Sequence, residues 1–316
     1  MLKDNYSIKE SKKTQKNRNA VILVVILLIF VTIPQILLSL VFTPKNIIGK
    51  SLGAEDFIKF ASGDKYILSS LYSTFLVSIC VYLLAKHYLK RDNASLGLEN
   101  PKKIRNYLKG AILAIFAMSL VFLQLKLFNQ VDVSSNYKNI SPAIFLAFLI
   151  GWILQGFEEE LLCRSVLMNY FAVYNGVESA IIANSLIFSI MHIGNAGFGA
   201  LPFINIFLMG TIFSLLFYIS DDIFLPAAAH SFWNFSQGNI YGINVSGISQ
   251  STSTLVKTDL TGYPLITGGA FGVEGGLITF FVEFVILMFL IYKVKNNENL
   301  YVDIDSKDRK VFESDL

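Results

Sequence analysis

The sequence predicts an all-α, polytopic integral membrane protein with about eight transmembrane helices and a polar intramembrane cavity. First, 53% of its 316 residues are hydrophobic and only 16% are charged, and the mean hydropathy is +0.55. A soluble domain carries about 25% charged residues and could not hide so much apolar surface. Second, the apolar residues form runs of about 20, the length that crosses a hydrocarbon layer of ~30 Å. Third, a few ionisable residues interrupt these runs, where each is costly unless it is paired or hydrated.

The eight runs define the predicted spans in order along the chain. They cover residues 20–42, 66–87, 107–128, 142–171, 176–193, 201–220, 223–235 and 271–293. The first run follows a basic leader, so a signal peptide is the competing interpretation, but its length favours a retained helix. The seventh run is short, and a helix that lines a polar cavity can begin below the membrane surface.

The distribution of basic residues predicts the orientation and the divisions of the chain. Residues 1–19 are a basic tail, 20–293 the transmembrane domain and 294–316 a second tail. With eight spans, both tails lie on one side, and the positive-inside rule makes that side the cytoplasm of a multi-pass cell-membrane protein. Four lysines in the loop 44–65 count against this orientation. The net charge of +3 is too small to indicate nucleic acid as a partner, whereas the bilayer is one.

A run of three carboxylates, Glu158, Glu159 and Glu160, interrupts the fourth span. On a helix, Glu160 and Arg164 are four residues apart and can pair. Glu159 is rotated from Glu160 by about 100°, so it points elsewhere. A carboxylate in an apolar site suits a general acid or base. The alternative is a charge cluster at the membrane boundary with a salt bridge at the helix end.

The fifth and seventh spans contribute two of the three histidines of the chain. His192 lies near the end of the fifth span, where a hydrogen-bonded packing role is the alternative. His230 and Asn234 are four residues apart and share one helix face. They could ligate, orient water or donate to an oxyanion, or they could form an interhelical hydrogen-bonded pair. The H-E-x-x-H motif of zinc metalloproteases and the G-x-S-x-G elbow are absent from the sequence.

These motifs resemble those of the CPBP intramembrane proteases, also called the Abi or CAAX protease and bacteriocin-processing family, and of the type II CAAX prenyl endopeptidases. The matching positions are E-E-x-x-x-R at 159–164, F-x-x-x-H at 188–192 and H-x-x-x-N at 230–234. The resemblance covers residues 142–236, the expected catalytic core. It implies an eight-helix fold with a cavity open toward the cytoplasm.

The resemblance also implies a role for each residue in an intramembrane endopeptidase. Glu159 would activate water, and His192 would hold that water or a metal. His230 and Asn234 would stabilise the oxyanion, while Glu160 and Arg164 would order the site. Glu159, His192 and His230 are the candidate ligands if a divalent metal such as zinc is used, because carboxylate and imidazole are zinc ligands.

The expected substrate is a membrane-associated peptide or protein. Members of the family cleave prenylated proteins, process peptide bacteriocins or confer immunity to them, or mature secreted peptides. Two other functions stay open on the sequence. One is a non-catalytic membrane scaffold or bacteriocin-immunity factor of the same family. The other is a proton-coupled transporter, since buried Glu and His residues also relay protons.

Overall fold

The computed structural model describes residues 2–14 and 63–296, with a few further residues between Leu23 and Ile33. Its α-helices are α1 (Tyr6–Thr14), α4 (Asp64–Leu83), α5 (Lys103–Leu127), α6 (Pro142–Glu160), α7 (Asn169–Asn175), α8 (Val177–Ile190), α9 (Ala200–Ser220), α10 (Phe224–Phe235), α11 (Pro264–Thr267) and α12 (Leu277–Asn296). Wider π-helical turns are η1 (Leu84–Tyr88), η3 (Leu161–Met168) and η4 (Ser236–Ile240). Short 3₁₀ turns are η2 (Tyr137–Asn139), η5 (Gly269–Phe271) and η6 (Val273–Gly275), and the strands are β1 (Val131–Ser135) and β2 (Val256–Leu260).

The second to eighth predicted spans coincide with described helices, and the first, 20–42, lies almost wholly outside the described residues. Among the described helices, four are long and apolar enough to cross a membrane: 64–88, 103–127, 200–220 and 277–296. The helical membrane fold is therefore confirmed, but the count of eight spans is not supported. Two of the predicted spans are short, since α8 has 14 residues and α10 has 12, and the fourth carries three glutamates and Arg164 in α6 and η3. At 1.5 Å per residue, 12 residues extend only ~18 Å.

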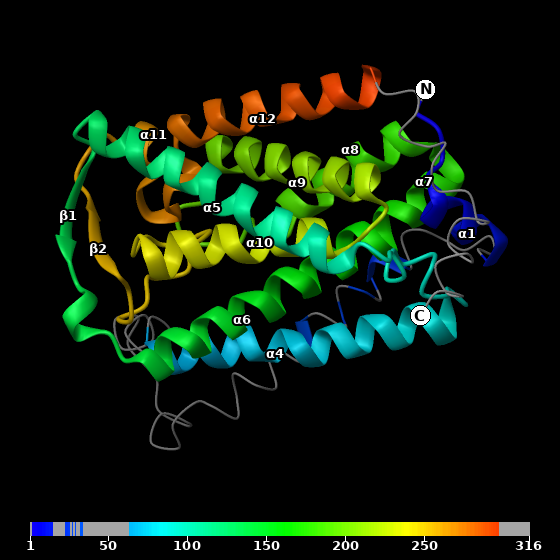
Figure 1. Ribbon diagram of the computed structural model, residues 1–316, viewed down its shortest axis with the longest axis horizontal. Coiled ribbons are helices and arrows are strands. Elements are labelled where there is room, and N and C mark those ends of the chain that lie inside the picture. Colours follow the sequence, from blue (N-terminus) through cyan, green and yellow to red (C-terminus); the bar gives the residue numbers. More distant parts are fainter. Residues whose placement is uncertain are drawn as a thin grey trace.

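Helix α10 lies between α5 and α6, with α4 on the far side of α6 (Figure 1). Glycines allow both close approaches. A Cβ atom on Gly110 of α5 would lie 2.2 Å from the carbonyl oxygen of Leu225, and one on Gly156 of α6 would lie 2.4 Å from Ser231 Oγ. Ala228 and Ala229 of α10 lie at the contact with Gly110, because small side chains let helices approach closely.

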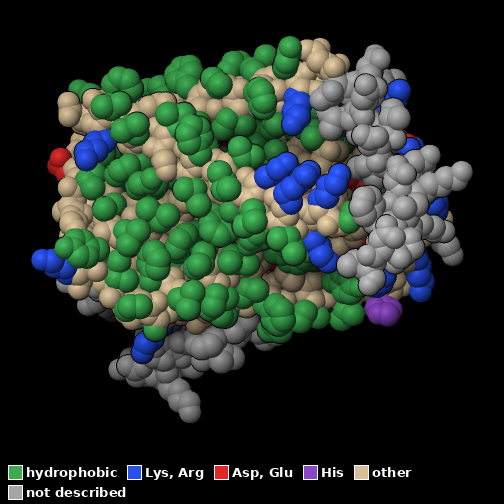
Figure 2. All heavy atoms as spheres, viewed as in Figure 1, with side chains coloured by type: hydrophobic (Ala, Val, Ile, Leu, Met, Phe, Trp, Pro, Cys, Tyr) green, Lys and Arg blue, Asp and Glu red, His purple; other side chains and the backbone are tan. Residues whose placement is uncertain are grey.

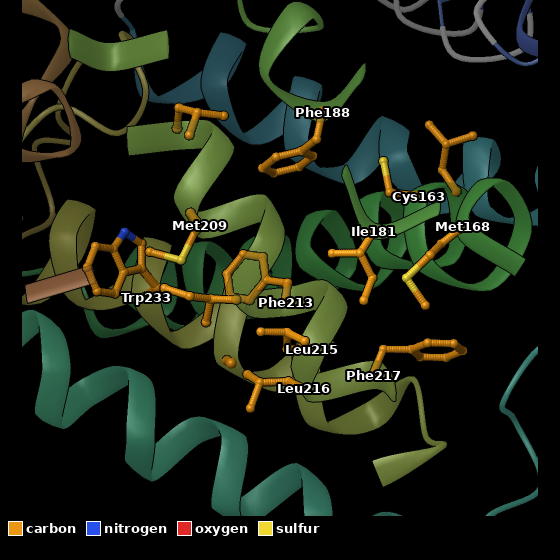
Figure 3. Packing of buried hydrophobic residues seen from close by; sticks show 14 of the residues in the cluster. Cys163, Met168, Ile181, Phe188, Met209, Phe213, Leu215, Leu216, Phe217 and Trp233 are labelled. Carbon is orange, nitrogen blue, oxygen red and sulfur yellow. The ribbon is translucent and has the colours of Figure 1, made fainter. Parts of the chain in front are cut away.

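Helices α8, α9 and α12 form the other side of the bundle, where α9 packs against both α8 and α12. Large apolar side chains fill the space between them and α10. Figure 3 shows part of this cluster, in which Phe213, Leu216 and Met209 of α9 lie near Trp233 of α10. The outward faces of these helices are apolar too, and Figure 2 shows hydrophobic side chains over most of the visible surface. This is the pattern of a helix bundle surrounded by lipid.

The two ends of the bundle are formed by different elements (Figure 1). At one end, β1 and β2 pair antiparallel, with Val131 opposite Leu260. These strands were not predicted by the sequence analysis. At the other end lies α1, which docks on α7, and Ser7 donates its backbone N–H to Asp221 Oδ1 at 2.9 Å. Lys and Arg side chains gather toward this second end (Figure 2).

The connection between α4 and α5 is tied to η3, which carries Arg164. Arg91 is buried, and its guanidinium donates to the carbonyl oxygen of Ser95 at 2.6 Å. Ser165 Oγ donates to the carbonyl oxygen of Leu96 at 2.7 Å. Burial lowers the pKa of Arg91 to about 10, so the guanidinium stays charged near neutral pH. The basic connection therefore anchors the helix segment that follows the three glutamates.

Candidate active site

The predicted site residues of α6 and α10 face one another in antiparallel order. Helix α6 begins at Pro142 with Ser141 as its N-cap, an arrangement that fixes the start of a helix. Towards its end, Gln155 accepts a hydrogen bond from Asn234 Nδ2 at 2.9 Å, and one turn later Glu160 contacts His230. His230 and Asn234 are four residues apart on α10, and Gln155 and Glu160 are five apart on α6, so each helix presents two polar groups to the same interface.

Glu160 is the centre of the buried charge network. Its Oε1 accepts hydrogen bonds from Arg164 Nη1 at 2.8 Å and from His230 Nδ1 at 2.9 Å. Both side chains of the Glu160–Arg164 pair are fully buried, and Arg164 Nη2 also donates to the carbonyl oxygen of Gly210 at 3.0 Å. The predicted pairing of Glu160 with Arg164 is confirmed. A buried carboxylate with two donors on one oxygen is held in a single orientation.

Two phenylalanines enclose this network on the side of α8 and α9. The Arg164 guanidinium lies 4.5 Å from the centre of the Phe188 ring and 5.4 Å from that of Phe213. The imidazole of His230 stacks on Phe213 with ring centres 5.0 Å apart. Aromatic faces attract a desolvated guanidinium and exclude water from its pair with Glu160. Figure 3 shows Phe188 and Phe213 within the buried apolar cluster.

Glu159 is the least enclosed of the three glutamates. Its side chain is 17% exposed, whereas those of Glu160 and Arg164 are 0% exposed. Gln155 donates a hydrogen bond to Glu159 Oε1. The other oxygen, Oε2, lies 3.9 Å from His230 Nε2 and has no hydrogen-bond partner among the described residues.

The arrangement of Glu159 and His230 leaves a place for a proton donor. Because His230 donates from Nδ1 to Glu160, the neutral ring presents the lone pair of Nε2 toward Glu159. A carboxylate oxygen and an imidazole lone pair that face each other across 3.9 Å are both acceptors. A water molecule hydrogen-bonded to both would satisfy them.

His192 does not lie on a helix, but in the turn that follows α8. Its Nδ1 donates to the carbonyl oxygen of Phe188 at 2.8 Å, so the neutral ring also keeps its lone pair on Nε2. The Phe188 ring lies 5.0 Å from the ring of His192 and 5.9 Å from that of His230, centre to centre. The Phe188 ring therefore contacts both histidines. His192 is half-buried at the edge of the site.

The sequence analysis gave no role to Gln155, Phe213 or Glu158. Gln155 bonds both Asn234 and Glu159, and its position one turn before Glu159 was the available signal. Phe213 lies on a uniformly apolar helix, so nothing in the sequence marked it. Glu158 is 2% exposed, and its Oε1 has no hydrogen-bond partner among the described residues.

The predicted metal site does not form a compact ligand set. Among the described residues, no group of three or more His, Cys, Asp or Glu side chains is placed to hold a metal ion. Glu159 and His230 lie close together, but His192 is separated from His230 by the ring of Phe188. Metal binding by these three residues stays a prediction, and we derive no reaction step from it.

One family model matches the part of the chain that contains the candidate site. Residues 140–236 match the model of the family described as type II CAAX prenyl endopeptidase Rce1-like. This segment contains α6 to α10 and all six predicted site residues. No curated protein and no solved structure matches the chain. Residues 140–236, about a third of the chain, are therefore similar to the type II CAAX prenyl endopeptidase Rce1-like family.

Proposed function

We propose that the chain is an intramembrane endopeptidase that hydrolyses a peptide bond of a membrane-associated peptide or protein. One observation carries the proposal: the glutamate and histidine motifs, far apart in sequence, meet where Glu160 bonds both Arg164 and His230, and Glu159 keeps an unpartnered oxygen beside His230. Buried polar groups are costly in a membrane protein, and their convergence on one point is typical of a functional site.

In the proposed reaction, Glu159 acts as the general base. It accepts a proton from a water molecule, whose oxygen then attacks the carbonyl carbon of the substrate peptide bond. His192 holds the water by accepting a hydrogen bond at its Nε2 atom. When the tetrahedral intermediate collapses, the C–N bond breaks and Glu159 returns the proton to the leaving nitrogen.

Asn234 and His230 stabilise the negative charge on the substrate oxygen in this proposal. The amide of Asn234 carries two N–H groups, so it can hold Gln155 with one and donate the other to the oxyanion. His230 donates from Nε2 when its ring carries both protons. Preorganised donors of this kind reduce the reorganisation needed in the transition state. Glu160 and Arg164 act as positioning residues because their side chains are fully enclosed.

The test is peptide cleavage by the purified full chain in liposomes, with quenched-fluorescence peptides that carry one apolar, membrane-anchoring end. We expect Glu159→Gln to lower the cleavage rate by roughly 10²–10⁴-fold, the contribution of a general base. Glu99→Gln makes the same chemical change on an exposed loop residue and should leave the rate unchanged.

Equal cleavage by the wild type and Glu159→Gln would remove Glu159 from the mechanism. If a Glu159→Ala, His192→Ala double variant kept its full biological activity in cells, the non-catalytic scaffold or immunity factor would be the better description. Substrate accumulation in sealed proteoliposomes without cleavage would favour the transporter.

A further inference from the structure

An apolar groove of about 550 Å³ lies on the side of α10 away from α6. Its walls come from α5, α9 and α12, for example Leu120, Met209 and Phe289. Ala229 and Trp233 of α10 lie at its base. The walls are apolar except for Gln124, as a site for a hydrocarbon chain requires.

One end of this groove has a basic rim. On α5, Arg105 and Lys109 lie eight and four residues before Leu113, which lines the groove, so all three share a helix face. On α12, Lys293 lies four residues after Phe289 and continues the groove-lining face of that helix. All three basic side chains are exposed.

The basic residues of the two helices meet at the same end of the molecule because α5 and α12 run in opposite directions. Figure 1 shows the start of α5 and the end of α12 on the side where α1 lies. Basic side chains gather on this part of the surface in Figure 2. Helix α5 has no carboxylate, and the one carboxylate of α12, Glu283, is buried. The rim therefore has no acidic residue on these helices to neutralise it.

We propose that the groove binds an anionic phospholipid of the adjacent leaflet, with its acyl chain along the groove and its head group on Arg105, Lys109 and Lys293. The length of the groove can be compared with that of an acyl chain. From Leu113 to Gln124, the groove-lining part of α5 extends ~17 Å at 1.5 Å per residue. One leaflet of a ~30 Å hydrocarbon core is ~15 Å deep. Lys109 lies four residues, ~6 Å, before Leu113. An acyl chain ~15 Å long that starts at Lys109 thus reaches about as far as Leu120, more than halfway along the groove.

The lipid tail would lie one side chain away from the candidate site. Phe213 lines the groove and also stacks on the imidazole of His230 with ring centres 5.0 Å apart. Ala229, at the base of the groove, directly precedes His230. The inference concerns lipid binding and does not rest on the proposed peptidase activity.

The experiment titrates the delipidated full chain in detergent with phosphatidylglycerol or phosphatidylcholine and counts bound lipid by native mass spectrometry. The wild type should bind phosphatidylglycerol more tightly. Each basic residue near an anionic lipid contributes roughly fivefold to affinity. Lys109→Gln should therefore lower phosphatidylglycerol affinity roughly fivefold, and the triple variant Arg105→Gln, Lys109→Gln, Lys293→Gln roughly 100-fold.

Lys126→Gln is the matched control, because Lys126 is an exposed lysine at the other end of α5. It should leave the affinity for phosphatidylglycerol unchanged. In a second variant, Ala117→Trp, the indole would fill the groove and lower binding of both lipids. Equal affinity of the wild type for both lipids would overturn the proposal, as would an equal effect of Lys126→Gln and Lys109→Gln. Recovery of a peptide instead of a lipid in the groove would also overturn it.

Discussion

At the residue scale, the enclosure of Glu160 dominates the candidate site. A carboxylate taken out of water is stabilised only if charged or polar groups replace its hydration, and Arg164 and His230 do so on one oxygen. Removal of one partner leaves the other charge buried and unpaired. The i to i+4 spacing predicted the bond to Arg164, but no spacing rule could predict the bond to His230, which is 70 residues away.

This enclosure gives a prediction for stability. Arg164→Met should reduce the free energy of unfolding by about 3–5 kcal/mol, because it leaves Glu160 buried without its cation. Thermal unfolding of the purified chain in detergent measures the effect. A variant as stable as the wild type would show that Glu160 is solvated in the folded protein.

The surface pair Lys13–Glu10, at 2.5 Å, provides the control. The side chain of Lys13 is 67% exposed, and exposed ion pairs contribute little to stability. Lys13→Gln should therefore leave the unfolding temperature unchanged. An equal loss of stability in Lys13→Gln and Arg164→Met would mean that burial of the Glu160–Arg164 pair does not affect the free energy of unfolding.

At the element scale, α10 is the helix on which the site depends. Gly110 lets α5 approach the start of α10, and Gly156 lets α6 approach α10 beside His230. The helices themselves were predictable from apolar runs. The strands β1 and β2 were not, because each has only five residues and they pair between segments more than 100 residues apart.

The close approach of α5 to α10 gives a second stability prediction. Gly110→Ala would place a Cβ atom 2.2 Å from the carbonyl oxygen of Leu225, which is backbone and cannot move aside without shifting α10. Overpacking of this kind costs about 1–3 kcal/mol. We expect a lower unfolding temperature and, because α10 carries His230, slower peptide cleavage.

Gly194→Ala is the comparison for this variant. A Cβ atom at Gly194 would meet no atom within 4 Å. This variant should unfold at the wild-type temperature. If Gly110→Ala were equally stable, α5 and α10 would have to lie further apart than the structure shows.

At the scale of the whole molecule, the two ends of the helix bundle differ chemically. Residues of α1 and the basic α4–α5 connection lie together, since Ser11 Oγ donates to the carbonyl oxygen of Ser95 at 3.4 Å. The β1–β2 pair lies at the opposite end (Figure 1). The basic leader and the basic α4–α5 connection therefore lie at the same end of the bundle.

The predicted cytoplasmic location of the basic end can be tested by cysteine labelling in a Cys80→Ser background. Lys9→Cys in α1 should react with a membrane-impermeant maleimide only after the cells are permeabilised, because the positive-inside rule places it in the cytoplasm. Lys138→Cys, next to β1, should react in intact cells. The reverse pattern would show that the chain is inserted the other way.

The sequence by itself determined the membrane class, the helical elements and the residues of the candidate site. These follow from local properties: apolar runs require lipid, and i to i+4 spacing fixes which side chains share a helix face. The tertiary structure decided which of these side chains meet. The bonds of Glu160 to His230 and of Gln155 to Asn234 depend on how closely α6 approaches α10. That approach follows from packing between residues distant in the chain, which no local pattern records.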